Sequence, residues 1–239
     1  LIFFVGVVLL ATLALLPPFL QNLMGYSVYD AGLILAPRGA GTMFGMIVAT
    51  RLMGRMDPRM IIVLGGLCTS VSLWLMTHFT VDVSQSTITW VGFLQGMGLG
   101  YIFVPLSTIA FLTLDPLLRT EGSAIYSLVR NIGSGIGISV VVTELADNIQ
   151  RNHAVLSEHI SPFNHLLDWG VLPQIWNTQT VQGLTALDGQ VMKQAVQLAY
   201  LQDFRLIMWM TLIIVPLALF MRNPGPMELH AKPDPALAE

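Results

Sequence analysis

The sequence predicts an all-α membrane protein in which six transmembrane helices form two inverted three-helix repeats. The first observation is composition: 54% of the 239 residues are apolar and only 10% are charged, whereas soluble domains contain about 25% charged residues. The second is that the apolar residues form separate blocks, each long enough to cross a bilayer. The third is a pattern, Arg-x-x-Gly-x-x-x-Gly, which occurs at residues 38–45 and again at 130–137.

The six predicted helices are separated by connections that contain proline, glycine or charged residues. In the first helix, Pro17 and Pro18 fall near the end, where they should kink it. The third helix is apolar on nearly all sides and should contact lipid. The fourth contains closely spaced glycines, which allow helix backbones to approach. The predicted spans are residues 1–22, 30–51, 60–78, 88–114, 122–145 and 204–221.

Two polar segments lie outside these spans. Residues 146–203 form a long segment between the fifth and sixth spans. Its end, 191–199, has an apolar spacing typical of a helix and is compatible with direct continuation into the last span. Residues 223–239 are rich in proline and charge, which predicts a disordered tail. Because the chain begins inside an apolar block, we expect it to be a piece of a longer protein.

Lysine and arginine are distributed unevenly between the two sides of the predicted helices. The short connections at 23–29 and 79–87 contain neither residue. Because short cytoplasmic connections are enriched in Lys and Arg, the opposite side is predicted to be cytoplasmic. Both chain ends are then cytoplasmic, and 146–203 lies outside. The residues that mark the cytoplasmic side are Arg51, Arg55, Arg59, Arg119, Arg222 and Lys232.

Each copy of the Arg–Gly pattern places its arginine and both glycines on one helix face, since positions three, four and seven apart share a face. An arginine costs about 2.5–3.5 kcal/mol in the middle of a bilayer, so this face should contact protein or a water-filled cavity. Arg38 and Arg130 each lie about eight residues, or about 12 Å, into helices that enter from opposite sides. Inverted repeats are typical of secondary transporters; a chance match between two glycine-rich helices is the alternative.

Several longer segments combine glycine, proline and arginine in a recognisable order. They are 18–27 (PFLQNLMGYS), 31–39 (AGLILAPRG), 54–59 (GRMDPR), 95–105 (QGMGLGYIFVP), 122–133 (GSAIYSLVRNIG) and 161–164 (SPFN). Together they resemble the major facilitator superfamily, and within it the fourteen-span drug:proton antiporters of the EmrB/QacA type. The resemblance covers nearly the whole chain.

The resemblance implies a C-terminal six-helix domain, whose N-terminal domain and two linker helices lie outside this sequence. It implies transport by alternating access between two such domains, and a location in the bacterial inner membrane. It also implies what each pair of helices faces: the central cavity for 1–22 and 88–114, the N-terminal domain for 30–51 and 122–145, and lipid for 60–78 and 204–221.

Three groups of residues are candidates for function. The alternatives are ordinary helix packing for the first group, structural hydrogen bonds to neighbouring helix carbonyls for the arginines of the second, and membrane topology for the third. An apolar cavity with a few polar groups suits amphipathic, often cationic, substrates; the cavity candidates are Gln21, Asn22, Gln95, Tyr101 and Phe103. Candidates for a domain interface or gate are Arg38, Gly41, Gly45, Arg130, Gly133 and Gly137. The segment that resembles the family's cytoplasmic loop motif contains Gly54, Arg55, Asp57 and Arg59.

The predicted spans contain no Asp, Glu, His or Lys in their central parts. The resemblance implies that the proton-coupling carboxylate belongs to the N-terminal domain, so this chain alone should not couple transport to protons. No cofactor is predicted, and no metal site, since His153, His159 and His165 are spaced six apart and do not share a helix face. The segment 132–135 could suggest a six-span serine protease, which needs a histidine in a neighbouring span. The last span contains no histidine and His78 lies at the end of its span, so an enzyme is not predicted.

The expected partners are the lipid bilayer, amphipathic drug-like molecules and the N-terminal transporter domain. An EmrB-like protein would also have a periplasmic adaptor and an outer-membrane channel as partners. A net charge of -3 argues against nucleic acid. The alternative from another class is a self-contained six-helix protein that dimerises as a half-transporter or scaffold. An upstream coding region for eight more spans would favour the transporter hypothesis.

Overall fold

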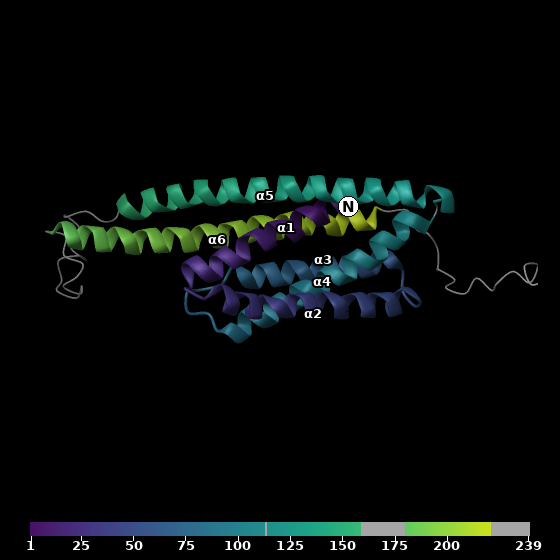
Figure 1. The fold of residues 1–239 in the computed structure, drawn as a ribbon, viewed down its shortest axis with the longest axis horizontal. Helices are drawn as coiled ribbons and strands as arrows, with labels where there is room; N and C mark the ends of the chain where they lie inside the picture. Colours follow the sequence, from purple (N-terminus) through teal and green to yellow (C-terminus); the bar gives the residue numbers. More distant parts are fainter. Residues whose placement is uncertain (113, 159–179, 221–239) are drawn as a thin grey trace, which may run out of the picture.

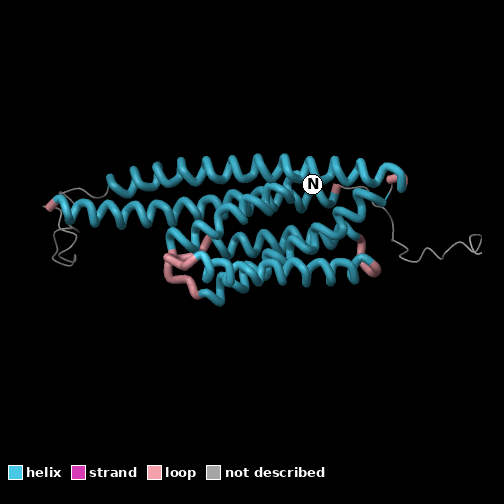
Figure 2. Tube along the Cα trace, in the orientation of Figure 1, coloured by secondary structure: helices cyan, strands magenta, loops and turns pink. Residues whose placement is uncertain are grey.

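The structure is a computed structural model that describes residues 1–112, 114–158 and 180–220, and its regular structure in these ranges is entirely helical (Figures 1 and 2). Six helices are long and apolar enough to cross a membrane. The predicted fold class is therefore confirmed. The helices are α1 (Ile2–Pro18), α2 (Val28–Met53), α3 (Pro58–Met76), α4 (Gln85–Leu112), α5 (Arg119–Glu158) and α6 (Val181–Leu219).

Proline shapes the end of the first helix. The α-helix stops at Pro18, and residues Phe19–Leu23 continue as a π-helical turn, η1. Pro17 and Pro18 cannot donate backbone hydrogen bonds, and their rings crowd the preceding turn, so regular α-helical bonding is disrupted here. The π turn places Phe19, Leu20 and Leu23 in the buried core.

Short polar side chains begin several of the other helices. Ser27 accepts a hydrogen bond from the backbone N–H of Asp30 at the start of α2. Asp57 does the same for Arg59 at the start of α3, where Pro58 occupies the first helical position. Both are favourable N-terminal caps. The connection at 54–57 is consequently short and places α2 and α3 antiparallel.

The last two helices are much longer than predicted. Helix α5 continues to Glu158 instead of ending at 145, and α6 begins at Val181 instead of 204. Most of the described part of 146–203 is therefore helical, and only the predicted continuation of 191–199 into the last span is confirmed. In Figure 1, α5 and α6 run side by side beyond the ends of the other helices.

A repeating stripe explains this helical hairpin. The buried residues of α6 recur every fourth position, which places them along one side of the helix, against α5. Polar pairs cross the same contact: His153 bonds Asp188 at 2.9 Å and Asn152 bonds Gln202 at 3.2 Å. The stripe consists of Gly183, Leu187, Val191, Ala195 and Ala199. His159, His165, the segment 161–164 and the tail 223–239 lie outside the described residues.

The two three-helix units, α1–α3 and α4–α6, pack so that the middle helix of each unit contacts the first helix of the other. Helix α2 of the first unit packs on α4 of the second, and α5 of the second unit packs on α1 of the first. Gly41 of α2 lies against the carbonyl oxygen of Phe93, and Gly133 of α5 lies against that of Phe3. The two contacts are equivalent under exchange of the units, as an inverted repeat requires.

Further glycine contacts follow the same correspondence. On the partner helices, Phe93, Gly96 and Met97 have the same spacing as Phe3, Gly6 and Val7. In each unit the backbone of the arginine also lies against a glycine of the partner helix. The two backbones can approach closely there because glycine has no side chain. The additional matching contacts are Gly45 with Met97, Gly137 with Val7, Gly96 with Arg38 and Gly6 with Arg130.

Candidate functional site: a cavity at Arg38 between α1, α2 and α4

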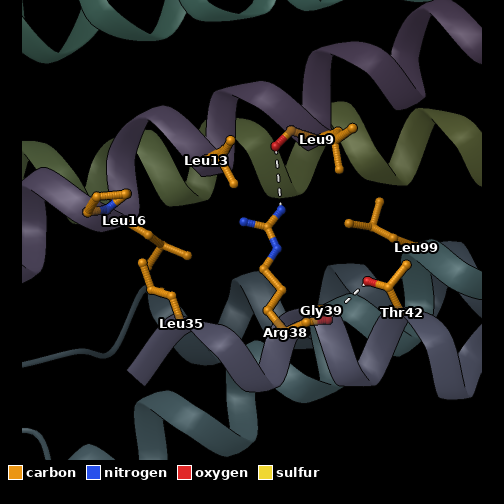
Figure 3. A pocket seen from close by; sticks show the side chains of 9 residues that line it. Leu9, Leu13, Leu16, Leu35, Arg38, Gly39, Thr42 and Leu99 are labelled. Carbon is orange, nitrogen blue, oxygen red and sulfur yellow. Dashed lines mark hydrogen bonds between the residues drawn. The ribbon is translucent and has the colours of Figure 1, made fainter. Parts of the chain in front are cut away.

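Arg38 is a buried charged residue in the middle of α2, with 7% of its surface exposed. Its guanidinium group points across to α1 and lines a cavity of about 220 Å³ (Figure 3). The walls come from three helices and are almost entirely aliphatic. They consist of Leu9, Leu13, Leu16, Pro17, Leu35, Gly39, Thr42 and Leu99.

The charge of Arg38 has little compensation. Its Nη2 atom donates to the carbonyl oxygen of Leu9 at 3.4 Å, which is long for such a bond. Within the described part of the chain, the one ion pair joins His153 and Asp188, so no carboxylate there lies within 4 Å of Arg38. The hydroxyl of Thr42 donates to the backbone carbonyl of Arg38 and makes no hydrogen bond to its guanidinium.

Arg130 is the counterpart of Arg38 in the second unit. It reaches from α5 to α4, where its guanidinium carbon lies 6.0 Å from the centre of the Phe103 ring. This distance is suitable for a cation–π interaction. Phe103 follows Phe93 in α4 at the same distance in sequence as Leu13 follows Phe3 in α1. Phe103 is therefore the counterpart of Leu13. The structure therefore brings Arg130 and Phe103 together and places both arginines in equivalent positions.

The other cavity candidates lie in different surroundings. Gln95 is fully buried, and its Nε2 donates to the Thr12 hydroxyl at 3.3 Å, which links α4 to α1. Tyr101 packs with a small cluster that includes Ala49 and Ile61, away from the Arg38 cavity. Gln21 and Asn22 lie in η1 at the end of the first span. None of these four lines the cavity at Arg38.

The glycines of the two Arg–Gly stripes lie between helices of this chain. Gly41, Gly45, Gly133 and Gly137 are all buried against helices of this same chain. The reason is that glycine allows closest approach between two helix backbones, and α4 and α1 occupy that place.

The loop motif at 54–59 acts mainly through its backbone and cap. Gly54 ends α2, and Asp57 caps α3. Among the described residues, neither Arg55 nor Arg59 makes an ion pair with Asp57. The Asp57 carboxylate accepts instead from the backbone N–H of Arg59 through Oδ1.

Sequence reasoning missed Asp203, which is a buried acidic residue with 1% of its surface exposed. Its Oδ1 accepts a bond from Asn148 of α5 at 3.3 Å, and its Oδ2 is buried without a partner. The boundary predicted at 204 placed it in a polar loop. The stripe that ends at Ala199 continues through Asp203 and Phe204 and could have revealed its burial.

Asp203→Asn is expected to raise the free energy of unfolding by about 1 kcal/mol, because it keeps the oxygen that accepts from Asn148 and removes a buried charge. The thermal unfolding midpoint of the purified protein measures the effect. Asp188→Asn is the matched control on the same helix. It disrupts an exposed pair with His153, which should change stability by less than about 1 kcal/mol. A midpoint lower for Asp203→Asn than for Asp188→Asn would contradict the expectation.

Comparison with known proteins agrees with this architecture. Residues 1–138 match the family described as Major Facilitator Superfamily. The fatty acid resistance protein FarB of Neisseria gonorrhoeae is 30% identical over 189 residues, which make up 74% of this chain and 37% of FarB. The multidrug export protein EmrB of Escherichia coli K12 is 28% identical over 153 residues, 64% of this chain and 30% of EmrB.

A third relative is the lincomycin resistance protein LmrB of Listeria monocytogenes, which is 29% identical over 162 residues. These residues make up 68% of this chain and 34% of LmrB. The chain thus spans about one third of the length of the curated relatives it matches. The family match covers more than half of the chain, and the six apolar helices have the expected inverted arrangement, so this multi-pass membrane protein belongs to the major facilitator superfamily.

Proposed function

We propose that this chain is the C-terminal six-helix half of a proton-coupled efflux permease in the bacterial inner membrane. Members of its family are transporters. The observation that carries the proposal is the exchanged packing of two inverted units, which gives Arg38 and Arg130 equivalent places, one beside α1 and the other beside α4. A second six-helix domain would complete the cavity, and rocking of the two domains would expose it alternately to each side.

Exposed apolar side chains on α2 and α5 support a second domain at this face. Met43, Phe44 and Ile47 of α2 are at least half exposed, and so is Leu128 of α5. They lie beside the glycines that hold α2 and α5 to their partner helices. A docked domain would cover these apolar side chains.

Amphipathic compounds are the proposed cargo. The relatives carry names that refer to fatty acids, lincomycin and multiple drugs. The cavity beside Arg38 is apolar with one polar group, which is the composition of sites for such molecules. Phe103, Gln21 and Asn22 are proposed to line the rest of the pathway, and Arg130 to act at the gate.

The proposed orientation places both ends of the chain in the cytoplasm. The arginines at 51, 55 and 59 support it through the enrichment of basic residues in cytoplasmic connections. The hairpin of α5 and α6 then extends outside the membrane on the periplasmic side. Its length supports the proposal that a periplasmic adaptor, connected to an outer-membrane channel, contacts this part of the protein.

Export can be tested with the full-length protein in a bacterial strain that lacks its own multidrug exporters. Energised cells should accumulate less ethidium or dodecanoate than cells with an empty vector. A protonophore should abolish the difference, because it removes the proton gradient. Equal accumulation with and without the protein would contradict export, and a difference that survives the protonophore would contradict proton coupling.

A further inference from the structure

The Arg38 cavity combines a buried positive charge with apolar walls. We propose that it binds the anionic head group of an amphipathic carboxylate and thereby selects acidic compounds for export, an inference that rests on the export function proposed above. It also differs from the expectation of cationic substrates, because a guanidinium group within the cavity disfavours a second cation.

The donors of Arg38 are available for this role. A guanidinium group has five N–H donors in a planar fork that fits the two oxygens of a carboxylate. The long bond to the Leu9 carbonyl is the only hydrogen bond that this group makes among the described residues. In Figure 3 the fork lies between the leucines of α1 and points into the cavity.

The other charges and rings near the cavity favour an anion. None of the residues that line it is acidic. The counterpart Arg130 lies over the Phe103 ring, whereas the equivalent position beside Arg38 is the aliphatic Leu13. Among the residues that the structure describes, Arg38 thus lacks both a carboxylate and an aromatic partner. A ligand anion would compensate a charge that is costly to bury alone.

The size of the cavity limits what it can hold. Its volume of about 220 Å³ is smaller than the roughly 300–1,000 Å³ typical of sites that enclose a drug-sized molecule. The cavity therefore takes a head group and the first part of an alkyl chain. Leu13, which lines the cavity, is 53% exposed, so the remainder of the alkyl chain can extend out of the cavity past this residue.

The test measures binding to the full-length protein in phosphatidylcholine nanodiscs without a proton gradient. The probes are dodecanoate, the neutral 1-dodecanol and the cationic dodecyltrimethylammonium. The wild-type protein should bind dodecanoate more tightly than either other probe. Arg38→Met should weaken dodecanoate binding about 10- to 100-fold, the loss expected for charge-assisted hydrogen bonds, and should leave 1-dodecanol binding unchanged.

Two variants control for other causes. Arg38→Lys retains the positive charge without the planar fork, so it should lose less dodecanoate affinity than Arg38→Met. The lysine variant also keeps the test decisive if the methionine variant fails to fold. Arg151→Met removes an exposed positive charge in the outer part of α5 and should bind dodecanoate as the wild type does. Unchanged dodecanoate binding in both Arg38 variants, or equal binding of dodecanoate and 1-dodecanol by the wild type, would overturn the inference.

An anionic lipid presents the same chemistry as an acidic substrate, and nanodiscs that contain phosphatidylglycerol distinguish the two. Dodecanoate affinity that is unchanged in them supports a substrate site. A tenfold loss of affinity there, abolished by Arg38→Met, would assign the cavity to a lipid phosphate and overturn the substrate role. Arg38-dependent binding in a protein that exports nothing would support the site and contradict the proposed function, so the two failures are distinguishable.

Discussion

Gly41→Ala and Gly133→Ala are each expected to lower the free energy of unfolding by about 1–3 kcal/mol, the usual cost of overpacking. A Cβ atom at Gly41 would collide with the carbonyl oxygen of Phe93, and one at Gly133 with that of Phe3. Both obstacles are helix backbone, which cannot rotate away as a side chain does. The helices must therefore separate and lose dispersion contacts, which are the main attraction between helices in lipid.

Each variant has a control two residues away in the same helix. Gly39 and Gly135 have open space where a Cβ atom would lie, so alanine should raise stability by up to about 1 kcal/mol through its higher helix propensity. The thermal unfolding midpoint, followed by size-exclusion chromatography of heated full-length protein, compares the four variants. Similar midpoints for Gly41→Ala and Gly39→Ala would show that α2 does not pack on α4 as described.

The glycine stripes also show what the sequence could and could not predict. Their spacing predicted two counterparts in inverted units, and the contacts of Gly41 and Gly133 confirm this correspondence. The spacing identifies residues that share a helix face, but it contains no information about which neighbour that face contacts. The neighbour of Gly41 is Phe93, far along the chain, and only the folded arrangement reveals it.

The hairpin of α5 and α6 was missed for a related reason. Hydropathy averages over a window, and the polar residues between 146 and 203 lowered that average below the level of a membrane span. The stripe from Gly183 to Ala199 supplies only one apolar or small residue in every four, so a window average does not detect it, although such a stripe allows two helices to pack closely. Asp203 was consequently assigned to a loop, although its neighbour Phe204 is fully buried.

The candidate site was predictable only in part. The cost of an arginine in lipid predicted that Arg38 contacts protein or a cavity, and the structure places it at a cavity. The sequence could not show that its carboxylate partners are absent among the described residues, or that Phe103 contacts Arg130 instead. Such distinctions depend on side chains from helices distant in the sequence.

Phe19→Ala is expected to lower the free energy of unfolding by about 3–5 kcal/mol, the range for truncating a buried aromatic side chain. Phe19 is fully buried and begins the π turn after Pro18. Its ring lies 5.3 Å from Tyr200, 6.0 Å from Phe204 and 6.3 Å from Phe79, measured between ring centres. One side chain thus joins the end of the first span, the connection after α3, and α6.

The size of the cavity left behind determines this loss, because the proline-shaped turn and α6 cannot both move to fill it. Phe19→Leu should therefore cost much less, about 1 kcal/mol, since leucine keeps most of the volume. Phe220→Ala is the control, because Phe220 is 87% exposed at the end of α6 and its loss should change stability by less than about 0.5 kcal/mol. Equal unfolding midpoints for Phe19→Ala and Phe220→Ala would contradict an aromatic cluster that holds α1 to α6.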